Sequence, residues 1–367
     1  MRHRRGDTPL YAQIKAYLEE QIRQGRLRPG DRVPSEAELA HQFGVSRITS
    51  KHALFLLAQE GLIYRIPGKG SFVADRATRA FGGHMMLGVV LPFLRMQHEL
   101  NLLRGAEAEA NRQGLTLVLR QSSGSQEVEA AAVRDLREAG AAALIVWPVD
   151  GAHYNPALLQ LSLEGFPTVL VDRCLEGVAL PAVVSDNREG ARLAAHYVAQ
   201  AGHRHVAVVS PPGDWASSIR DRQLGFLMGL AEAGVRREPD LWLTDLKNDL
   251  AQDRVRIRTF LAAHPEVTAL LAVNSGNGEA AFQAARDLGR SVPDDLSIVC
   301  FDQPDPASVE GIPFTHVAQQ AEEIGKRAVQ LAIQRIQGDP SSLRLEVVPV
   351  KLLHGRTCQP PAEAASG

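Results

Sequence analysis

The stretch PSEAELAHQFGVSRITSKHALFLLAQ, residues 34–59, decides the fold of the first part of the chain. Ser35 and Glu38 have the spacing of a capping box, in which each side chain pairs with the backbone of the other residue. Leu39 and Phe43 then give the following residues one apolar face. This pattern predicts a short helix that begins at the proline and packs on one side.

A turn and a second helix follow within the same stretch. Gly44 suits a tight turn, and Ser46 can cap the helix that begins after it. Leu54 and Leu57 lie at helical spacing on the inner side of that helix. The sequence therefore predicts helix, turn, helix, with the opposite side of the second helix free to meet a partner.

The flanking segments extend this unit to a winged helix-turn-helix. Apolar residues recur at helical spacing over residues 10–22, which predicts a preceding helix. The segments 62–66 (LIYRI) and 71–73 (SFV) predict two strands, joined by a tight turn at 67–70 (PGKG). The expected unit is an α+β DNA-binding domain over residues 1–74.

This order of motifs resembles the GntR family of bacterial transcription regulators. The match covers about residues 8–74 through PLYAQI, GRLRPGDRVPSEAELA, FGVSRITSKHAL and EGLIYRIPGKGSFV. The resemblance implies binding to double-stranded operator DNA, with the second helix of the motif in the major groove and the wing in the minor groove. The candidate DNA-binding residues are Ser35, Ser46, Arg47, Thr49, Lys51, Gly68, Lys69 and Gly70.

The expected roles differ among these residues. Arg47 can reach a guanine edge or a phosphate, Thr49 a base or the backbone, and Lys51 a phosphate. Lys69 lies between two glycines at the wing tip, where the backbone can approach DNA closely. The alternative for each cation is an ordinary solvated surface charge. The family commonly has arginine at the positions of Ala37 and Lys51, so one contact is in doubt and one bidentate group is replaced by a point charge.

Charge is distributed unevenly along the 367 residues. The chain has a net charge of −2, an apolar fraction of 45% and a charged fraction of 22%, as in ordinary globular proteins. Residues 1–79 carry 14 Lys and Arg against 8 Asp and Glu, whereas residues 80–367 carry 26 against 34. A basic unit is thus joined to a larger acidic one, and residues 75–86 (DRATRAFGGHMM) are expected to be the linker.

Several classes of protein are excluded at this stage. No stretch approaches the ~18 apolar residues of a membrane helix, and the basic start has no apolar core behind it, so we expect a cytoplasmic protein without membrane contact. The linker shows no amphipathic face for a membrane surface. Cys174, Cys300 and Cys358 are too few and too far apart for a disulfide framework or a zinc site. No metal or cofactor is expected.

Strands and helices alternate over residues 87–357. Short apolar runs such as Leu87–Leu91, Ala143–Trp147 and Ala269–Val273 are separated by amphipathic or Ala-rich helical segments. About 270 residues of this pattern exceed one sheet, so we expect an α/β domain of two lobes with parallel sheets, and a tail at 358–367. Ligands of such sheets bind beyond the carboxyl ends of the strands, here in a cleft between the lobes.

This second part looks like the effector domain of the LacI/GalR family, which is similar to the type I periplasmic binding proteins. The matching phrases include FPTVLVDR, VVSDNREGARLAAHYVAQAGHRHVAVV, SIRDRQLGF, VPDDLSIVCFDQPD and IPFTHVAQQAEEIG. A GntR-type winged helix joined to such a domain is the arrangement of the arabinose-responsive repressors. Carried over by motif, the effector-binding residues are Asp172, Arg222, Asn274, Asp302 and Gln319, with aromatic candidates Phe93, Trp147, Trp215 and Trp242.

Their chemistry suits a small carbohydrate. Carboxylates accept hydrogen bonds from hydroxyls, arginine donates a fixed fork, amides do both, and a ring can cover the apolar face of a sugar. The alternative for a single strand-end Asp is a helix cap or ion pair, and for a Trp it is packing. Ser275 and Cys300 depart from the family, which has Asp and Gly there, so the hydroxyls that are read and the local packing should differ.

The expected function is a repressor that binds a pseudo-palindromic operator as a homodimer and responds to a small carbohydrate. An activator and a sensor of a nucleoside or other metabolite remain open, because no motif encodes the direction of the response. An exported sugar receptor is disfavoured by the winged helix. The stretch Gly276–Ala281 matches a dinucleotide-binding pattern, but it lies late in the series, and no catalytic constellation is found, so no enzyme is expected.

Overall fold

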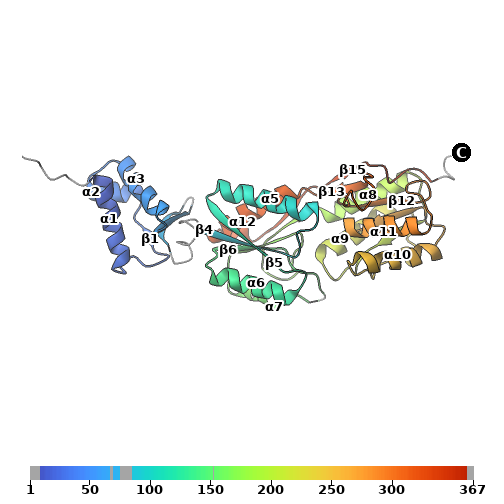
Figure 1. Ribbon diagram of the computed structural model, residues 1–367, viewed down its shortest axis with the longest axis horizontal. Helices are drawn as coiled ribbons and strands as arrows, with labels where there is room; N and C mark the ends of the chain where they lie inside the picture. Colours follow the sequence, from blue (N-terminus) through green and yellow to red (C-terminus); the bar gives the residue numbers. More distant parts are fainter. Residues whose placement is uncertain (1–8, 67–68, 75–84, 152, 362–367) are drawn as a thin grey trace, which may run out of the picture.

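The computed structural model describes residues 9–66, 69–74, 85–151 and 153–361. Figure 1 shows three bodies in a row along the longest axis: a small N-terminal domain and two larger lobes. Figure 1 also places the N-terminal domain beside the lobe that contains β4, while the second lobe lies at the far end. The chain is therefore elongated, with the lobe that begins at β4 between the other two bodies.

The N-terminal domain is the predicted winged helix-turn-helix. Its elements are α1 (Leu10–Arg23), β1 (Arg32–Val33), α2 (Glu36–Phe43), α3 (Arg47–Gln59), β2 (Ile63–Ile66) and β3 (Gly70–Val73). The strands form an antiparallel sheet of order β1-β3-β2. Ile14, Leu39, Leu54 and Leu57 meet in one core, so the apolar positions that defined each helix also hold the helices together.

The N-terminal lobe is a parallel sheet of order β14-β8-β7-β6-β4-β5. Helices α5 and α12 cover one face of the sheet, and α6 and α7 cover the other (Figure 1). Its elements are β4 (Met85–Leu91), α5 (Gln97–Arg112), β5 (Leu115–Gln121), α6 (Gln126–Glu138), β6 (Ala143–Val146), α7 (Pro156–Leu163), β7 (Thr168–Val171), β8 (Ala182–Ser185), α12 (Ala321–Ile336), η2 (Pro340–Ser342) and β14 (Leu345–Val348). Strands buried on both faces read as continuous apolar runs, which is how the sequence showed them.

The C-terminal lobe has a sheet of order β10-β9-β11-β12-β13-β15. Helices α8 and α9 pack on one face, and α10 and α11 on the other. Its elements are α8 (Asn187–Gln200), β9 (Val206–Val209), α9 (Ser217–Glu232), η1 (Pro239–Leu241), β10 (Trp242–Leu243), α10 (Leu250–Ala263), β11 (Ala269–Ala272), α11 (Ser275–Asp287), β12 (Ser297–Phe301), β13 (Thr315–Ala318) and β15 (Lys351–Leu353). The two-lobed parallel architecture is confirmed, except that β15 runs antiparallel to β13.

Three short connections join the lobes: Asp186 between β8 and α8, residues 319–320 between β13 and α12, and residues 349–350 between β14 and β15. They are hydrogen-bonded to one another. The Asp186 amide donates to the Val348 carbonyl at 2.8 Å, and Gln320 Nε2 donates to the Pro349 carbonyl at 2.7 Å. The connections therefore form one compact hinge next to the strand ends.

The segments expected as linker and tail are only partly described. Residues 75–84 of the expected linker lie outside the described residues. Met85 and Met86, also expected in the linker, begin β4 and are buried, because they pair with the start of β5. In the expected tail, Cys358 is buried and the Gln359 amide donates to Ser297 Oγ at 3.1 Å, so these two residues pack on the C-terminal lobe.

Two helix pairs approach closely through glycines. A Cβ added at Gly325 of α12 would lie 2.0 Å from the Leu102 carbonyl oxygen of α5, and one at Gly105 of α5 would lie 2.0 Å from the Glu322 carbonyl oxygen of α12. In the C-terminal lobe, a Cβ at Gly225 of α9 would lie 2.2 Å from the Arg188 carbonyl oxygen of α8. In each pair, the backbones of the two helices are therefore in direct contact at the glycine.

Gly325→Ala should separate α5 from α12 and lower the free energy of unfolding by about 1–3 kcal/mol, the usual cost of overpacking. Urea unfolding measures the difference. Gly276→Ala is the matched control, because Gly276 is also helical and a Cβ there meets only Asn274 Oδ1 at an ordinary 3.5 Å. Equal stability of the two variants would contradict the close approach.

Candidate functional site

Two aspartates mark the carboxyl ends of the sheets where the lobes meet. Asp172 follows β7 of the N-terminal lobe, and Asp302 follows β12 of the C-terminal lobe. Both have left-handed backbones, with φ of 68° and 58°, a conformation that aspartate and asparagine tolerate better than most residues. The turn after each strand thereby aims a carboxylate at the opposite lobe.

Asp172 is buried and 5% exposed. Its Oδ2 accepts hydrogen bonds from Arg173 Nε at 3.1 Å and Nη2 at 3.0 Å, and from Ser218 Oγ of the other lobe at 3.4 Å. Burial raises the pKa of the Asp172 carboxyl, although the charge of Arg222 opposes that rise. A carboxylate with this environment gains from any further hydrogen-bond donor.

Arg222 of α9 is the buried cation of the C-terminal lobe. Its Nε donates to Asn187 Oδ1 at 2.8 Å, its Nη1 donates to the Val273 carbonyl at 2.7 Å, and its guanidinium lies 4.0 Å from the Phe301 ring centroid. Burial lowers the pKa of Arg222, while Asp172 and Asp302 raise it. Hydrogen bonds thus fix two nitrogens of the guanidinium, and its charge acts on both Asp172 and Asp302.

Asp302 is held by the hinge. Its Oδ2 accepts a hydrogen bond from Gln319 Nε2 at 2.6 Å, and Gln319 Oε1 accepts one from Ser185 Oγ at 2.7 Å. Ser185 ends β8 and Gln319 follows β13, so both residues border connections between the lobes. The carboxylate of Asp302 is therefore tied directly to the segments about which the lobes can move.

His98 of α5 lies between the two carboxylates and was missed from the sequence. Its Nε2 is 3.8 Å from Asp172 Oδ1 and its Nδ1 is 3.8 Å from Asp302 Oδ2. Its ring meets the Trp147 ring edge-on at 5.4 Å between centroids. No motif in the sequence marks His98, which lies in the first turn of a helix and not at the end of a strand. We call His98, Asp172, Arg222, Asp302 and Gln319 the inter-lobe cluster.

Two buried polar atoms beside this cluster are unsatisfied. Trp147 is 7% exposed, and its indole Nε1 has no hydrogen-bond partner among the described residues. The same holds for His98 Nε2. Buried groups of this kind are normally paired, so a ligand with hydroxyl groups would satisfy them.

Asn274 and Trp215 lie near the mouth of the cleft. Asn274 Nδ2 donates to Asn248 Oδ1 at 3.1 Å, and Asn248 Nδ2 reaches Asp150 Oδ2 of the other lobe at 3.4 Å. The Trp215 carbonyl accepts from the Gly151 amide at 3.2 Å across the lobes. Trp215 is thus part of the contact between the lobes, whereas Asn274 is held within the C-terminal lobe, where its Oδ1 also caps α11 by accepting from the Asn277 amide at 2.7 Å.

Two aromatic candidates lie apart from the inter-lobe cluster. Phe93 packs at the turn that contains Gly124, beneath the Arg95 guanidinium at 4.7 Å. Trp242 packs against the α8–α9 core, beneath the Arg237 guanidinium at 4.8 Å. A strand of two residues gives no periodicity from which the direction of the Trp242 ring could be predicted.

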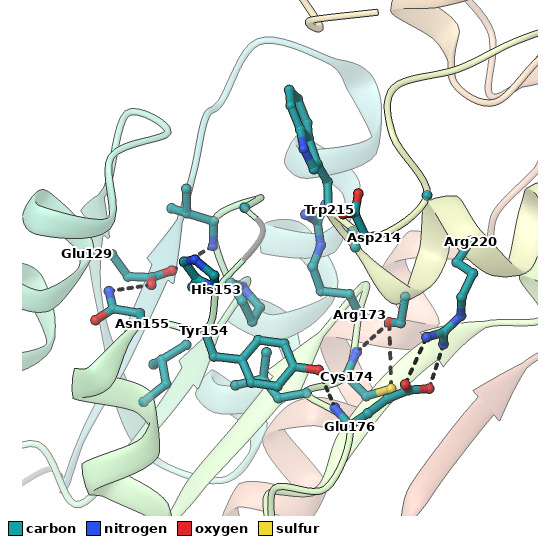
Figure 2. A pocket seen from close by; sticks show the side chains of 18 residues that line it. Glu129, His153, Tyr154, Asn155, Arg173, Cys174, Glu176, Asp214, Trp215 and Arg220 are labelled. Carbon is teal, nitrogen blue, oxygen red and sulfur yellow. Dashed lines mark hydrogen bonds and ion pairs between the residues drawn. The ribbon is translucent and has the colours of Figure 1, made fainter. Parts of the chain in front are cut away.

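A pocket beside the inter-lobe cluster opens between the lobes. Figure 2 shows Tyr154 and Glu176 of the N-terminal lobe opposite Arg220 of the C-terminal lobe. Arg220 Nη1 and Nη2 donate to the Glu176 carboxylate at 2.8 and 2.6 Å, and the Cys174 amide donates to Ser217 Oγ at 3.0 Å (Figure 2). These bridges hold the two lobes together.

The dinucleotide-like stretch has a packing role. It opens α11, and a Cβ at Gly278 would lie 2.9 Å from Cβ of the buried Cys300. The side chain that replaces the family glycine at 300 is therefore accommodated by a glycine opposite. Among the described residues, no group of three or more His, Cys, Asp or Glu could hold a metal ion. Within the same residues, no helix is long and apolar enough to cross a membrane.

The exposed end of the DNA-binding domain is the first turn of α3. Arg47 and Lys51 are exposed there, and Thr49 Oγ1 lies 2.9 Å from Ser46 Oγ. Ile48 between them is 80% exposed and was not predicted, although such an apolar side chain suits the methyl group of thymine. Ser35 and Ser46 are occupied as helix caps, accepting from the amides of Glu38 and Thr49 at 3.2 Å.

The wing is the β2–β3 hairpin. Gly70 has φ of 116°, which requires glycine, and Gly68 lies outside the described residues. Lys69 is exposed, but its Nζ donates to the Ile336 carbonyl at the end of α12 at 3.4 Å. The wing tip therefore contacts the N-terminal lobe.

Comparison with known proteins agrees with this geometry. Residues 10–73 match the model of bacterial regulatory proteins of the gntR family, and residues 195–358 match the periplasmic binding protein-like domain. The chain thus joins a gntR-type domain to a periplasmic-binding-protein-like domain. Over 90% of its length and 92% of the relative's, it is 27% identical to the arabinose metabolism transcriptional repressor of Geobacillus stearothermophilus.

Solved structures match the two-lobed part. A putative ribose operon repressor from Burkholderia thailandensis superposes with a TM-score of 0.65 and 25% identity, over 73% of this chain and 98% of that one. A LacI family transcriptional regulator from Mycobacterium smegmatis gives a TM-score of 0.66 at 20% identity, over 75% and 100%. The expected LacI-type fold is confirmed.

Asp172→Asn should raise the melting temperature, because it removes a charge that burial disfavours and because asparagine suits the left-handed backbone. Arg222 keeps its contacts to Asn187 and Val273. Because burial raises the pKa of Asp172 in the folded state, the folded chain binds a proton on this carboxyl more tightly than the unfolded chain does. The unaltered chain therefore loses stability as the pH rises from the unfolded-state pKa of Asp172 through its folded-state pKa. The gain should therefore be largest at alkaline pH and shrink as the pH falls.

Differential scanning calorimetry between pH 5 and 8.5 measures this gain at each pH. Asp214→Asn, the same change at an exposed carboxylate on the rim of the pocket, should leave the melting temperature unchanged. A gain that grows toward acid pH would contradict the assignment.

Proposed function

We propose that the protein is a transcriptional repressor that binds an operator as a homodimer and is released by a small carbohydrate held in the inter-lobe cluster. The observation that carries the effector assignment is the juxtaposition of acceptors and donors from both lobes. Asp172 and His98 come from one lobe, and Asp302 and Arg222 from the other. The similarity to named arabinose and ribose repressors supports the same class of effector.

The proposed chemistry is hydrogen bonding to hydroxyl groups. The aspartates accept from two hydroxyls, Gln319 and Asn274 contribute amide groups, and Trp147 offers its indole N–H. Because these groups belong to different lobes, the bound sugar stabilises the closed arrangement over an open one. Binding, not catalysis, is the role that we assign to the cleft.

The proposed DNA contacts are made by the exposed turn of α3 and by the wing. Arg47 and Thr49 reach base edges or the backbone, Ile48 contacts a thymine methyl, and Lys51 and Lys69 bind phosphates or the minor groove. One such domain reads a half-site, so two copies related by a two-fold axis are required for a palindromic operator.

Arg222→Ala should abolish the response to the sugar and leave operator affinity within about twofold, because it removes the cation of the cleft without touching the DNA-binding domain. Thermal-shift titration against pentoses and hexoses measures sugar binding. For the unaltered chain, a sugar at 100 times its dissociation constant should add about 2.7 kcal/mol of stability.

Arg188→Ala is the control for Arg222→Ala, because Arg188 is an exposed arginine of the neighbouring helix, paired with Asp221 at 2.8 Å. It should retain the sugar response. If no sugar stabilises the unaltered chain, the effector class is wrong; if Arg222→Ala still responds, the assignment of this residue is wrong.

Arg47→Ala should weaken operator binding by about 1–3 kcal/mol. Lys51→Ala should reduce the slope of log affinity against log salt concentration by about one, because one counterion fewer is released on binding. Fluorescence anisotropy with a duplex enriched from a randomised library on the unaltered chain measures both effects. Arg286→Ala, which removes an exposed arginine paired with Glu310 in the C-terminal lobe, should have no effect. Equal losses from all three substitutions would indicate non-specific attraction only.

A further inference from the structure

The wing packs against the sensor domain through one face of its first strand. Side chains alternate along β2, so Ile63 points into the core of the winged helix while Tyr64 and Ile66 lie on the other face. Tyr64 and Ile66 pack against the hydrophobic core of the N-terminal lobe. Ile333 and Ile336, in the last turn of α12, border the same core.

The wing tip makes a polar contact at the same place. Lys69 Nζ donates to the carbonyl oxygen of Ile336, the last residue of α12, at 3.4 Å. The C-terminus of a helix carries partial negative charge, so an ammonium group is favoured there. The contact thus offers Lys69 an oxygen with partial negative charge, in the place where a DNA phosphate would offer an anionic one.

We propose that this docked arrangement is an autoinhibited form of the DNA-binding domain, in which the wing binds the end of α12 and is therefore not available to operator DNA. The inference rests on the proposed function, because it assumes that the wing contacts DNA. The wing tip cannot lie against the end of α12 and in the minor groove at once, because both positions would occupy the surface around Lys69. Operator binding therefore requires the wing to leave α12, and the docking energy lowers the apparent operator affinity.

The same helix reaches the inter-lobe cluster at its other end. Ala321, the first residue of α12, comes two residues after Gln319, which donates to Asp302. The 16 residues of α12 span about 24 Å. One rigid helix therefore joins the hydrogen bonds of the cleft to the surface on which the wing docks. A sugar that alters the Asp302–Gln319 contact acts on the docking surface through α12.

Ile336→Lys tests the proposal from the sensor side, leaving the DNA-binding residues intact. An ammonium group at the docking surface repels Lys69 and cannot replace the apolar side chain there, so it should release the wing and raise operator affinity by about fivefold or more, while weakening the effect of the sugar. Gln330→Lys is the matched control: it adds the same charge on the same helix, and its ammonium can still donate to Glu109, as Gln330 does at 3.3 Å. Anisotropy with the enriched duplex measures affinity, and calorimetry confirms that both variants fold.

Hydrogen–deuterium exchange of the unaltered chain gives a second measurement that needs no variant. Adding the duplex should protect α3 and increase exchange at residues 333–337, because the wing leaves this turn. Unchanged exchange at 333–337, together with equal affinities of the unaltered chain and Ile336→Lys, would overturn the docking proposal. Failure of the unaltered chain to bind any enriched duplex would overturn the proposed function instead.

Discussion

The structure depends on a small set of buried charges shared between two lobes. Asp172 and Asp302 approach the guanidinium of Arg222 from different sheets, and each carboxylate lies near His98. Removing such charges from water is costly unless they are paired, and the interactions of Asp172 with Arg222 and of His98 with Asp302 exist only when the lobes are together. Closure of the cleft and satisfaction of these charges are therefore one event, which makes the relative position of the lobes sensitive to what fills the space between them.

The rest of the fold supplies the stiffness that makes this sensitivity useful. Parallel sheets buried on both faces fix the strand ends, and glycine contacts lock α5 to α12 and α8 to α9. Within the part of the chain that the structure describes, the backbone passes between the lobes in three short segments that hydrogen-bond to one another. A rearrangement in the cleft can thus be expressed as motion of whole lobes about a hinge, with little internal deformation.

The sequence predicted the elements that depend on local signals. The capping box of Ser35 and Glu38 and the cap at Ser46 placed the helices of the DNA-binding domain, since a cap is specified within a few residues. Asp172, Arg222, Asp302 and Gln319 were identified through the resemblance of their motifs, and the structure brings these four residues together.

The remaining site features depend on contacts between distant segments. Nothing near His98 in the sequence indicates that two carboxylates from different sheets will enclose it. The exposure of Ile48 likewise follows from the packing of α3, which turns Leu54 and Leu57 inward. The contact of Lys69 with Ile336 joins residues 267 positions apart, and no periodicity could reveal it.

The backbone contact between α5 and α12 has a mechanical consequence. His98 belongs to α5 and Ile336 to α12, and the facing glycines leave no slack for one helix to slide independently of the other. The His98 imidazole in the cleft and the Ile336 carbonyl that contacts Lys69 therefore belong to one tightly packed pair of helices. A ligand that shifts α5 at His98 must therefore shift α12 with it, so one packed pair of helices connects the cleft to the surface that contacts the wing.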